Sequence, residues 1–150
     1  MLDAALRDGT GHRRSVFEVF SRRLSGGRRY GVLAGTGRVL DAVTRFRFGE
    51  PELEWLAAEQ VVSPATIDWL ADYRFGGTIS GYREGELYFP NSPVLTVEGS
   101  FAEAVILETL ILSVLNADSA IATAAARMVS AKVPSTVSTG EFGKYSSPSR

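Results

Sequence analysis

The sequence lacks cysteine altogether and contains a single histidine, His12, among its 150 residues. Without cysteine, a disulfide framework, a thiolate metal site and a thiol nucleophile are excluded. One histidine cannot build an ordinary zinc site, because such sites take several nitrogen or sulfur ligands. His12 lies in a Gly-rich basic loop, where an exposed side chain is favoured over a catalytic one. The sequence therefore shows none of the usual catalytic constellations.

Long apolar runs are also lacking. The strongest spans residues 104–115 and is interrupted by Glu108 and Thr109. A membrane-spanning helix needs about 20 mostly apolar residues, so this run predicts a buried helix and no membrane partner. The first residues contain no apolar stretch that could serve as the core of a signal peptide. Together with the absence of cysteine, this leads us to expect a cytoplasmic protein.

Charge of one sign does not dominate, since the formal net charge is −1. The charges are unevenly spread, however: residues 1–50 hold ten arginines against five acids, and residues 51–150 hold six basic against twelve acidic residues. This asymmetry can mark a surface that meets phosphates, or it can reflect solvated ends of strands and helices. The second explanation is favoured, and we expect no nucleic-acid partner.

The hydrophobic content of 45% is ordinary for a folded domain, and its periodicity predicts a mixture of helices and strands. Thr36, Ser63 and Ser100 are predicted helix caps. Residues 116–119 are polar or small and are expected to break the helix that starts at 101. Helices are predicted at residues 2–7, 36–46, 51–56, 64–74, 101–115 and 120–131, and strands at residues 15–20, 29–35, 78–82, 86–89 and 94–99.

The last nineteen residues, 132–150, differ in composition from the rest of the chain. They include five serines, two threonines, two prolines and two glycines. Such a segment can bury little apolar surface, so we expect it to be disordered. The sequence therefore predicts a folded region at residues 1–131, of α+β or α/β class, followed by a Ser/Thr/Pro-rich tail.

Basic and glycine-rich segments are the candidate anion sites. The arginine pairs at 13–14, 22–23 and 28–29 are phosphate candidates, since a guanidinium donates two parallel hydrogen bonds. Neighbours on a strand point to opposite faces, so Arg22 and Arg23 cannot both serve one site if the strand extends that far. Gly35-Thr36-Gly37 at a strand-to-helix junction is either a phosphate loop or a tight turn, and the turn is favoured.

Acidic residues on predicted strands and helices are candidates for carboxylate pairs. Glu84, Glu86 and Glu98 lie on or beside predicted strands, where solvated strand faces explain them better than a catalytic pair. Glu108 lies within the most apolar helix, where an unpaired charge is expensive to bury. It must reach a partner, a boundary or a functional site, and structural pairing is the favoured explanation.

Several segments match a known family in order. They are FEVFSRRL at 17–24, RRYGVLAGTG at 28–37, GYREGELYFP at 81–90, EGSFAE at 98–103 and IATAAARMVS at 121–130. In this order the chain resembles, from Met1 to Ala131, the amino-terminal part of actinobacterial nicotinate phosphoribosyltransferases. None of the segments is a catalytic signature, but their combination is specific.

The resemblance implies the amino-terminal domain of a type II phosphoribosyltransferase, with helices leading into an α/β barrel that this chain lacks. It also implies an activity: nicotinate and phosphoribosyl pyrophosphate give nicotinate mononucleotide, with Mg²⁺ and ATP, in pyridine nucleotide salvage for NAD biosynthesis. Both ligase and glycosyltransferase chemistry are implied. Family members act as homodimers.

The chain departs from the family pattern in three places. A tyrosine-bearing segment of the family would precede Met1, Ala117 stands where the family often has histidine, and the tail from Lys132 stands where the barrel would begin. No catalytic, substrate-binding or metal-ligating residue can therefore be carried over. We expect a fragment that is inactive alone. The alternative is a non-catalytic module that docks on an intact enzyme subunit.

Overall fold

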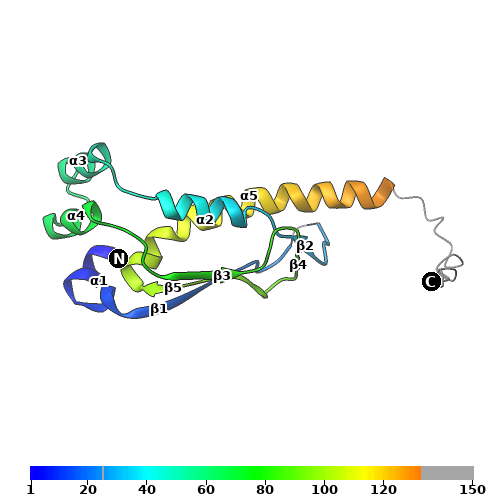
Figure 1. Ribbon diagram of the computed structural model, residues 1–150, viewed down its shortest axis with the longest axis horizontal. Coiled ribbons are helices and arrows are strands. Elements are labelled where there is room, and N and C mark those ends of the chain that lie inside the picture. The colour runs from blue at the N-terminus through cyan, green and yellow to red at the C-terminus, as the bar shows by residue number, and fades with distance from the viewer. Residues whose placement is uncertain (25, 133–150) are drawn as a thin grey trace, which may run out of the picture.

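One long helix, α5 (Phe101–Lys132), runs along most of the molecule (Figure 1). The computed structural model describes residues 1–24 and 26–132, so the predicted tail at 133–150 lies outside the described residues. In chain order, α5 is preceded by α1 (Leu2–Arg7), the 3₁₀ turn η1 (Thr10–His12), β1 (Arg14–Phe20), β2 (Gly31–Val32), α2 (Thr36–Arg45), α3 (Glu50–Ala58), α4 (Pro64–Ala71), β3 (Thr78–Gly81), β4 (Leu87–Tyr88) and β5 (Pro93–Ser100).

The main sheet is antiparallel, with strand order β1-β5-β3. Its register places Phe17 of β1 and Ile79 of β3 opposite Val97 of β5. Alternate residues of a strand point to opposite faces, so Val16 and Glu18 project away from these three side chains and are exposed. The sheet thus has one apolar face to bury and one solvated face.

The first half of α5 covers the apolar face of this sheet. Leu107, Ile111 and Leu115 recur every four residues along one side of the helix and are buried. Val39 and Val43 of α2 complete the same core. An amphipathic helix on a one-sided sheet therefore accounts for the predicted α+β class.

The two strands that flank residues 83–85 belong to different sheets. β3 pairs with β5, whereas β4 pairs with β2 in a separate two-stranded ribbon. Gly31 of β2 lies against the Tyr88 ring of β4, and a Cβ atom at Gly31 would lie 2.3 Å from that ring. Because only glycine leaves room for the ring, this residue fixes the close pairing of the ribbon.

Two of the three predicted helix caps are confirmed. Ser63 Oγ accepts a hydrogen bond from the Thr66 amide at the start of α4. Ser100 Oγ accepts from the Glu103 amide at 3.3 Å, and the Glu103 carboxylate accepts from the Ser100 amide at 3.1 Å, which forms a capping box. Each cap supplies partners for amides that a helix start leaves unpaired.

The third cap, at Thr36, is wrong. Gly35 occupies the cap position of α2, with a left-handed φ of 96°, and Thr36 begins the helix. Within the part of the chain that the structure describes, the buried Thr36 Oγ1 has no hydrogen-bond partner. Glycine is favoured at this cap because the left-handed conformation costs a residue with a side chain more.

The expected helix break at 116–119 is also wrong, since α5 continues through these residues. The side chains of Asp118 and Ser119 bind other segments instead of competing for the helix backbone. Ser119 Oγ accepts from the Ala34 amide at 3.1 Å and donates to the Ala34 carbonyl at 3.2 Å. Asp118 pairs with Arg38 of α2 at 2.6 Å. Polar residues in mid-helix thus anchor α5 to the rest of the fold.

Because α5 is unbroken, it is long and apolar enough to cross a membrane by length and composition alone. The length of the apolar run therefore does not by itself exclude a membrane-spanning helix. Core helices of other proteins meet the same criteria, and the first half of α5 is packed on the sheet through Leu107 and Ile111.

At the end of the molecule away from the end of α5, helices α3 and α4 lie side by side (Figure 1). α4 is tied to α1 by Asp3, whose carboxylate accepts from the Ser63 amide at 2.9 Å and from Thr66 Oγ1 at 2.8 Å. The hydrogen bonds from Ser63 and Thr66 hold the pKa of the Asp3 carboxyl well below its ordinary value. The ionised form of Asp3 is therefore the form that joins the two helices.

Candidate functional site

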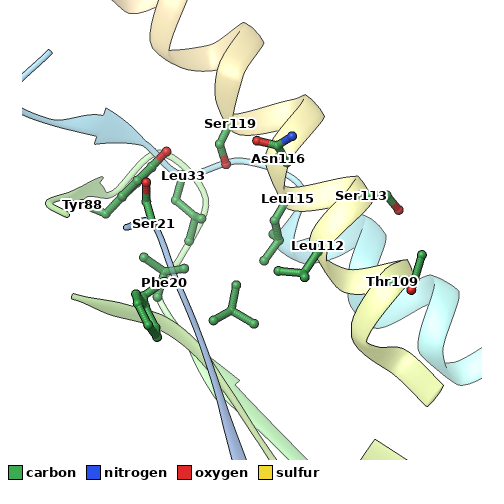
Figure 2. A pocket seen from close by; sticks show the side chains of 12 residues that line it. Phe20, Ser21, Leu33, Tyr88, Thr109, Leu112, Ser113, Leu115, Asn116 and Ser119 are labelled. Atoms are coloured by element: carbon green, nitrogen blue, oxygen red, sulfur yellow. The ribbon is translucent and has the colours of Figure 1, made fainter. Parts of the chain in front are cut away.

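A cavity of about 540 Å³ opens between the end of β1 and the middle of α5 (Figure 2). Phe20, Leu33 and Tyr88 form one wall, and Leu112 and Leu115 project from the helix on the other side. The polar groups among the lining side chains are the hydroxyls and the amide of Ser21, Tyr88, Thr109, Ser113, Asn116 and Ser119.

The lining of this cavity limits its chemistry. The described residues that line it include no carboxylate, imidazole, ammonium or guanidinium group, so they offer no general acid or base at neutral pH. A neighbouring hollow of about 260 Å³ shares Ser21, Tyr88 and Asn116 with it and adds Arg23 and Arg28. The combined surface is apolar at one end and cationic at the other, which suits binding better than catalysis.

The predicted arginine pairs do not form one site. β1 ends at Phe20, so Arg22 and Arg23 lie beyond the strand, while Arg14 stands at its opposite end and pairs with Glu98. Of the three pairs, Arg23 and Arg28 alone line the same hollow. The explanation of the arginines as solvated ends of strands thus holds for Arg14. Arg23 and Arg28 stay candidates for binding an anion.

The start of α2, at Gly35-Thr36-Gly37, is filled by a side chain of the protein itself. The Glu84 carboxylate accepts hydrogen bonds from the Gly35 amide and from the Gly37 amide, both at 3.0 Å. A helix start prefers a negative group, and Glu84 meets that preference. The tight-turn interpretation of the glycines is therefore favoured by the structure, and no phosphate is needed there.

Glu84 is exposed, as predicted, but it lies in a turn instead of on a strand, and its contacts with the start of α2 were not predicted. Glu84 lies between β3 and β4, in a turn whose next residue, Gly85, has a φ of 84°. The turn brings the carboxylate to Gly35, the cap residue of α2, which lies 49 residues earlier in the chain. The sequence around Glu84 indicates a turn but not this partner.

The other acidic candidates do not converge. Glu86 is exposed, and Glu98 pairs with Arg14 on β1. The predicted structural pairing of Glu108 is wrong, since it is exposed and makes no ion pair with any residue in the ranges 1–24 and 26–132. The first half of α5 buries one side, and Glu108 faces water on the other, where its charge stays hydrated.

A second polar hollow, of about 370 Å³, lies beside the start of α5 and includes His12, Glu98 and Glu103. Burial disfavours the ionised Glu103, but hydrogen bonds from Ser100 and Gly76 outweigh it and lower the pKa of this carboxyl. Both oxygens of Glu103 are thus engaged in structure. His12 is exposed at the rim, as expected.

The hydroxyl of Tyr73 is likewise a structural group. It donates to the backbone carbonyl of Glu103 at 2.9 Å, and burial raises the pKa of Tyr73 well above its ordinary value. The ring packs edge-on against Phe46 and Phe48. Tyr73 therefore links the segment after α4 to the start of α5 and stays protonated.

The described residues offer no cluster of ligands for the Mg²⁺ ion that the resemblance implies. Nowhere in residues 1–24 and 26–132 do three side chains of histidine, aspartate or glutamate gather as ligands. Glu84, Glu98 and Glu103 are each held by amides or by a guanidinium, as described above. No catalytic step through a metal is therefore derived for these residues.

Known proteins match this chain in sequence and in fold. The family described as nicotinate phosphoribosyltransferase N-terminal domain matches residues 1–116. The nicotinate phosphoribosyltransferase pncB1 of Mycobacterium tuberculosis is 63% identical over 131 residues, which cover 87% of this chain and 29% of that protein. The Bacillus subtilis nicotinate phosphoribosyltransferase is 34% identical over 128 residues, covering 85% of this chain and 26% of that protein.

The fold agrees with these sequence matches. The crystal structure of human nicotinic acid phosphoribosyltransferase superposes with a TM-score of 0.78 at 29% identity, covering 85% of this chain and 26% of the human chain. The chain thus spans less than a third of the length of these relatives. With the helix-on-sheet fold described above, these matches show that the chain belongs to the nicotinate phosphoribosyltransferase family, of which it carries the amino-terminal domain.

Proposed function

We propose that this chain serves the nicotinate phosphoribosyltransferase reaction, in which nicotinate and phosphoribosyl pyrophosphate give nicotinate mononucleotide and pyrophosphate for NAD salvage. The observation that supports this is the 63% identity over 131 residues to the Mycobacterium tuberculosis relative. For the complete enzyme we also propose Mg²⁺ and ATP as cofactors, a homodimer and a cytoplasmic location.

Within that enzyme, the described region acts as a scaffold. Transfer of a phosphoribosyl group needs fixed donors around the developing charge. Here the carboxylates of Glu84 and Glu103 bind backbone amides of their own fold, and the cavity between β1 and α5 has no charged side chain among its described lining residues. The chain alone is therefore expected to be inactive.

The direct test is an activity assay with and without the rest of the enzyme. The purified chain is incubated with nicotinate, phosphoribosyl pyrophosphate and Mg-ATP, and nicotinate mononucleotide is quantified by chromatography. No product above the blank is expected. The chain is then co-expressed with the part of the Mycobacterium tuberculosis relative that it does not match, and product is expected; that part expressed by itself is the control.

Two results would contradict the proposal. Product from the chain alone would rule out a pure scaffold. Absence of product from a soluble complex of the two parts would rule out participation in this reaction.

The second candidate is a non-catalytic module that docks on an intact enzyme subunit. The exposed Ile121, Met128 and Val129 favour it, since they offer an apolar contact surface on α5. An intact subunit, however, already carries its own amino-terminal domain, which the module would have to displace. Titration of the chain into the complete Mycobacterium tuberculosis enzyme separates the candidates, because the module predicts a saturable change in activity.

A further inference from the structure

The second half of α5, residues 117–132, carries apolar side chains that no other described residue covers. Ile121, Met128 and Val129 are 70%, 62% and 64% exposed. Figure 1 shows this half of the helix extending past the β2–β4 ribbon, away from the sheet. Beyond Thr123, no residue of α5 is buried.

These side chains continue the core-facing side of the same helix. Eighteen residues make five turns of an α-helix, so residues 18 apart point in nearly the same direction. Ala125 and Val129 therefore share the directions of Leu107 and Ile111, which are 0% and 2% exposed against the sheet. Ile121 lies one turn before Ala125 on this side. The apolar side of α5 thus extends beyond the sheet that buries its first half.

The family match ends near the point where α5 extends past the sheet. The N-terminal domain match ends at residue 116, at the midpoint of α5. A match of 131 residues in a chain of 150 must nevertheless include most of residues 117–132. The exposed half of the helix therefore lies past the amino-terminal domain match but within the region shared with the Mycobacterium tuberculosis relative. That relative has more than twice as many residues outside the match as within it.

We propose that residues 117–132 dock against the carboxyl-terminal part of a nicotinate phosphoribosyltransferase, the part that follows the matched region in its relatives. Ile121, Ala125 and Val129 form the centre of the contact, and the small side chains of Ala117 and Ala124 allow close approach beside it. This inference rests on the proposed function, since that function names the enzyme to which the partner belongs.

The test uses the full 150-residue chain, tagged and co-expressed with the unmatched carboxyl-terminal part of the Mycobacterium tuberculosis relative. The variant carries Ile121→Asp and Val129→Asp. The control carries Ser130→Asp, which adds one negative charge to the same part of the helix. Residue 130 is three turns past Ser119 and lies on nearly the opposite side of the helix from Ile121. Co-purification through the tag and the dissociation constant by biolayer interferometry are the readouts.

The unmodified chain and the control are expected to retain the partner in equimolar amounts. The double variant is expected to bind at least about 100-fold more weakly, since two buried aliphatic contacts are lost. The melting temperature of the chain by itself should move by no more than about 2 °C, because both side chains are exposed there. That control separates loss of docking from loss of folding.

Three results would overturn the docking proposal. One is failure of the unmodified chain to retain the partner, and another is equal retention of the double variant. The third is a chain that sediments alone as a dimer, or floats with phosphatidylcholine vesicles, through the same two residues without binding the partner. Association without product formation would keep the docking proposal and reject the proposed activity, so the two failures are distinguishable.

Discussion

The two halves of α5 hold similar numbers of apolar residues, eleven in 101–116 and ten in 117–132, but seven of the latter are alanine, and the two halves have opposite surroundings. In residues 101–116, Ala104, Leu107 and Ile111 are buried against the sheet and α2. In residues 117–132, the buried side chains are the hydroxyl-bearing Ser119 and Thr123. The comparison shows that the apolar side chains of a helix are buried only as far along the helix as the sheet extends.

The forces that hold the two halves also differ. The first half loses apolar area from water, which stabilises it in proportion to that area. The second half is attached by directional bonds, since Ser119 binds both backbone groups of Ala34 and Thr123 Oγ1 accepts from the Val32 amide at 2.9 Å. Both hydroxyls reach the backbone around β2. Five substitutions test this division, from the largest effect to the smallest.

Leu107→Ala should cost the most. The side chain is fully buried between helix and sheet, so its truncation leaves a cavity and should lower the free energy of unfolding by about 2–5 kcal/mol. Urea unfolding followed by circular dichroism measures this. A cost below about 1 kcal/mol would mean that the first half of α5 is not the core of the fold.

Ser119→Ala should cost about 1–3 kcal/mol, because it leaves the Ala34 amide in a partly buried position without a partner. Ser130→Ala is the matched control, since Ser130 Oγ bonds the carbonyl of Ala126 on the exposed end of the helix. The same urea titration is used. Equal effects of the two substitutions would contradict the assignment of Ser119 as an anchor.

Ser100→Ala removes the cap at the beginning of α5 and should cost about 1 kcal/mol. Ser100→Asn should recover most of that loss, because asparagine is also a good cap. Thermal melting of the three proteins at one pH gives the comparison. An unchanged melting temperature for Ser100→Ala would show that the sheet alone fixes where α5 begins.

Glu103 should make stability depend on acid. Its pKa is lowered in the fold, so its contribution is present above the ordinary glutamate value of about 4.3 and is lost as the pH falls through the lowered value. In Glu103→Gln, the decrease in melting temperature between about pH 5 and pH 3 should be shallower than in the unmodified chain. Identical slopes would mean that the carboxylate is equally stabilised in the unfolded chain.

Ile121→Ala should have the smallest effect, within about 0.5 kcal/mol, because the side chain is exposed in the chain by itself. Measured beside Leu107→Ala, it gives the direct contrast between the halves. A cost near that of Leu107→Ala would show that a second copy or another segment already covers the second half in solution.

Local sequence signals predicted most elements well. β-branched and aromatic residues located β1, and Ser63-Pro64 located the start of α4, because these choices depend on neighbours in the chain. The capping box of Ser100 and Glu103 is equally local. The resemblance to the family then supplied the fold class, which the matches confirm.

Contacts between distant segments were not predictable in the same way. Nothing near Glu84 in the sequence indicates a bond to Gly35, and nothing near Ser119 indicates one to Ala34. The predicted break at 116–119 is wrong for this reason, since polar residues are typical of a helix end but here contact distant segments. Catalytic residues remain unassigned, because no motif of that kind matched this chain.

The absence of any glycine or proline from Phe101 to Lys132 has a mechanical consequence. A helix of 32 residues is about 48 Å long and has no point at which its backbone bends cheaply. Twisting or tilting at its far end would therefore be transmitted along the rigid helix to the sheet. The last turn of α5, at Lys132, would move together with β1 and β5.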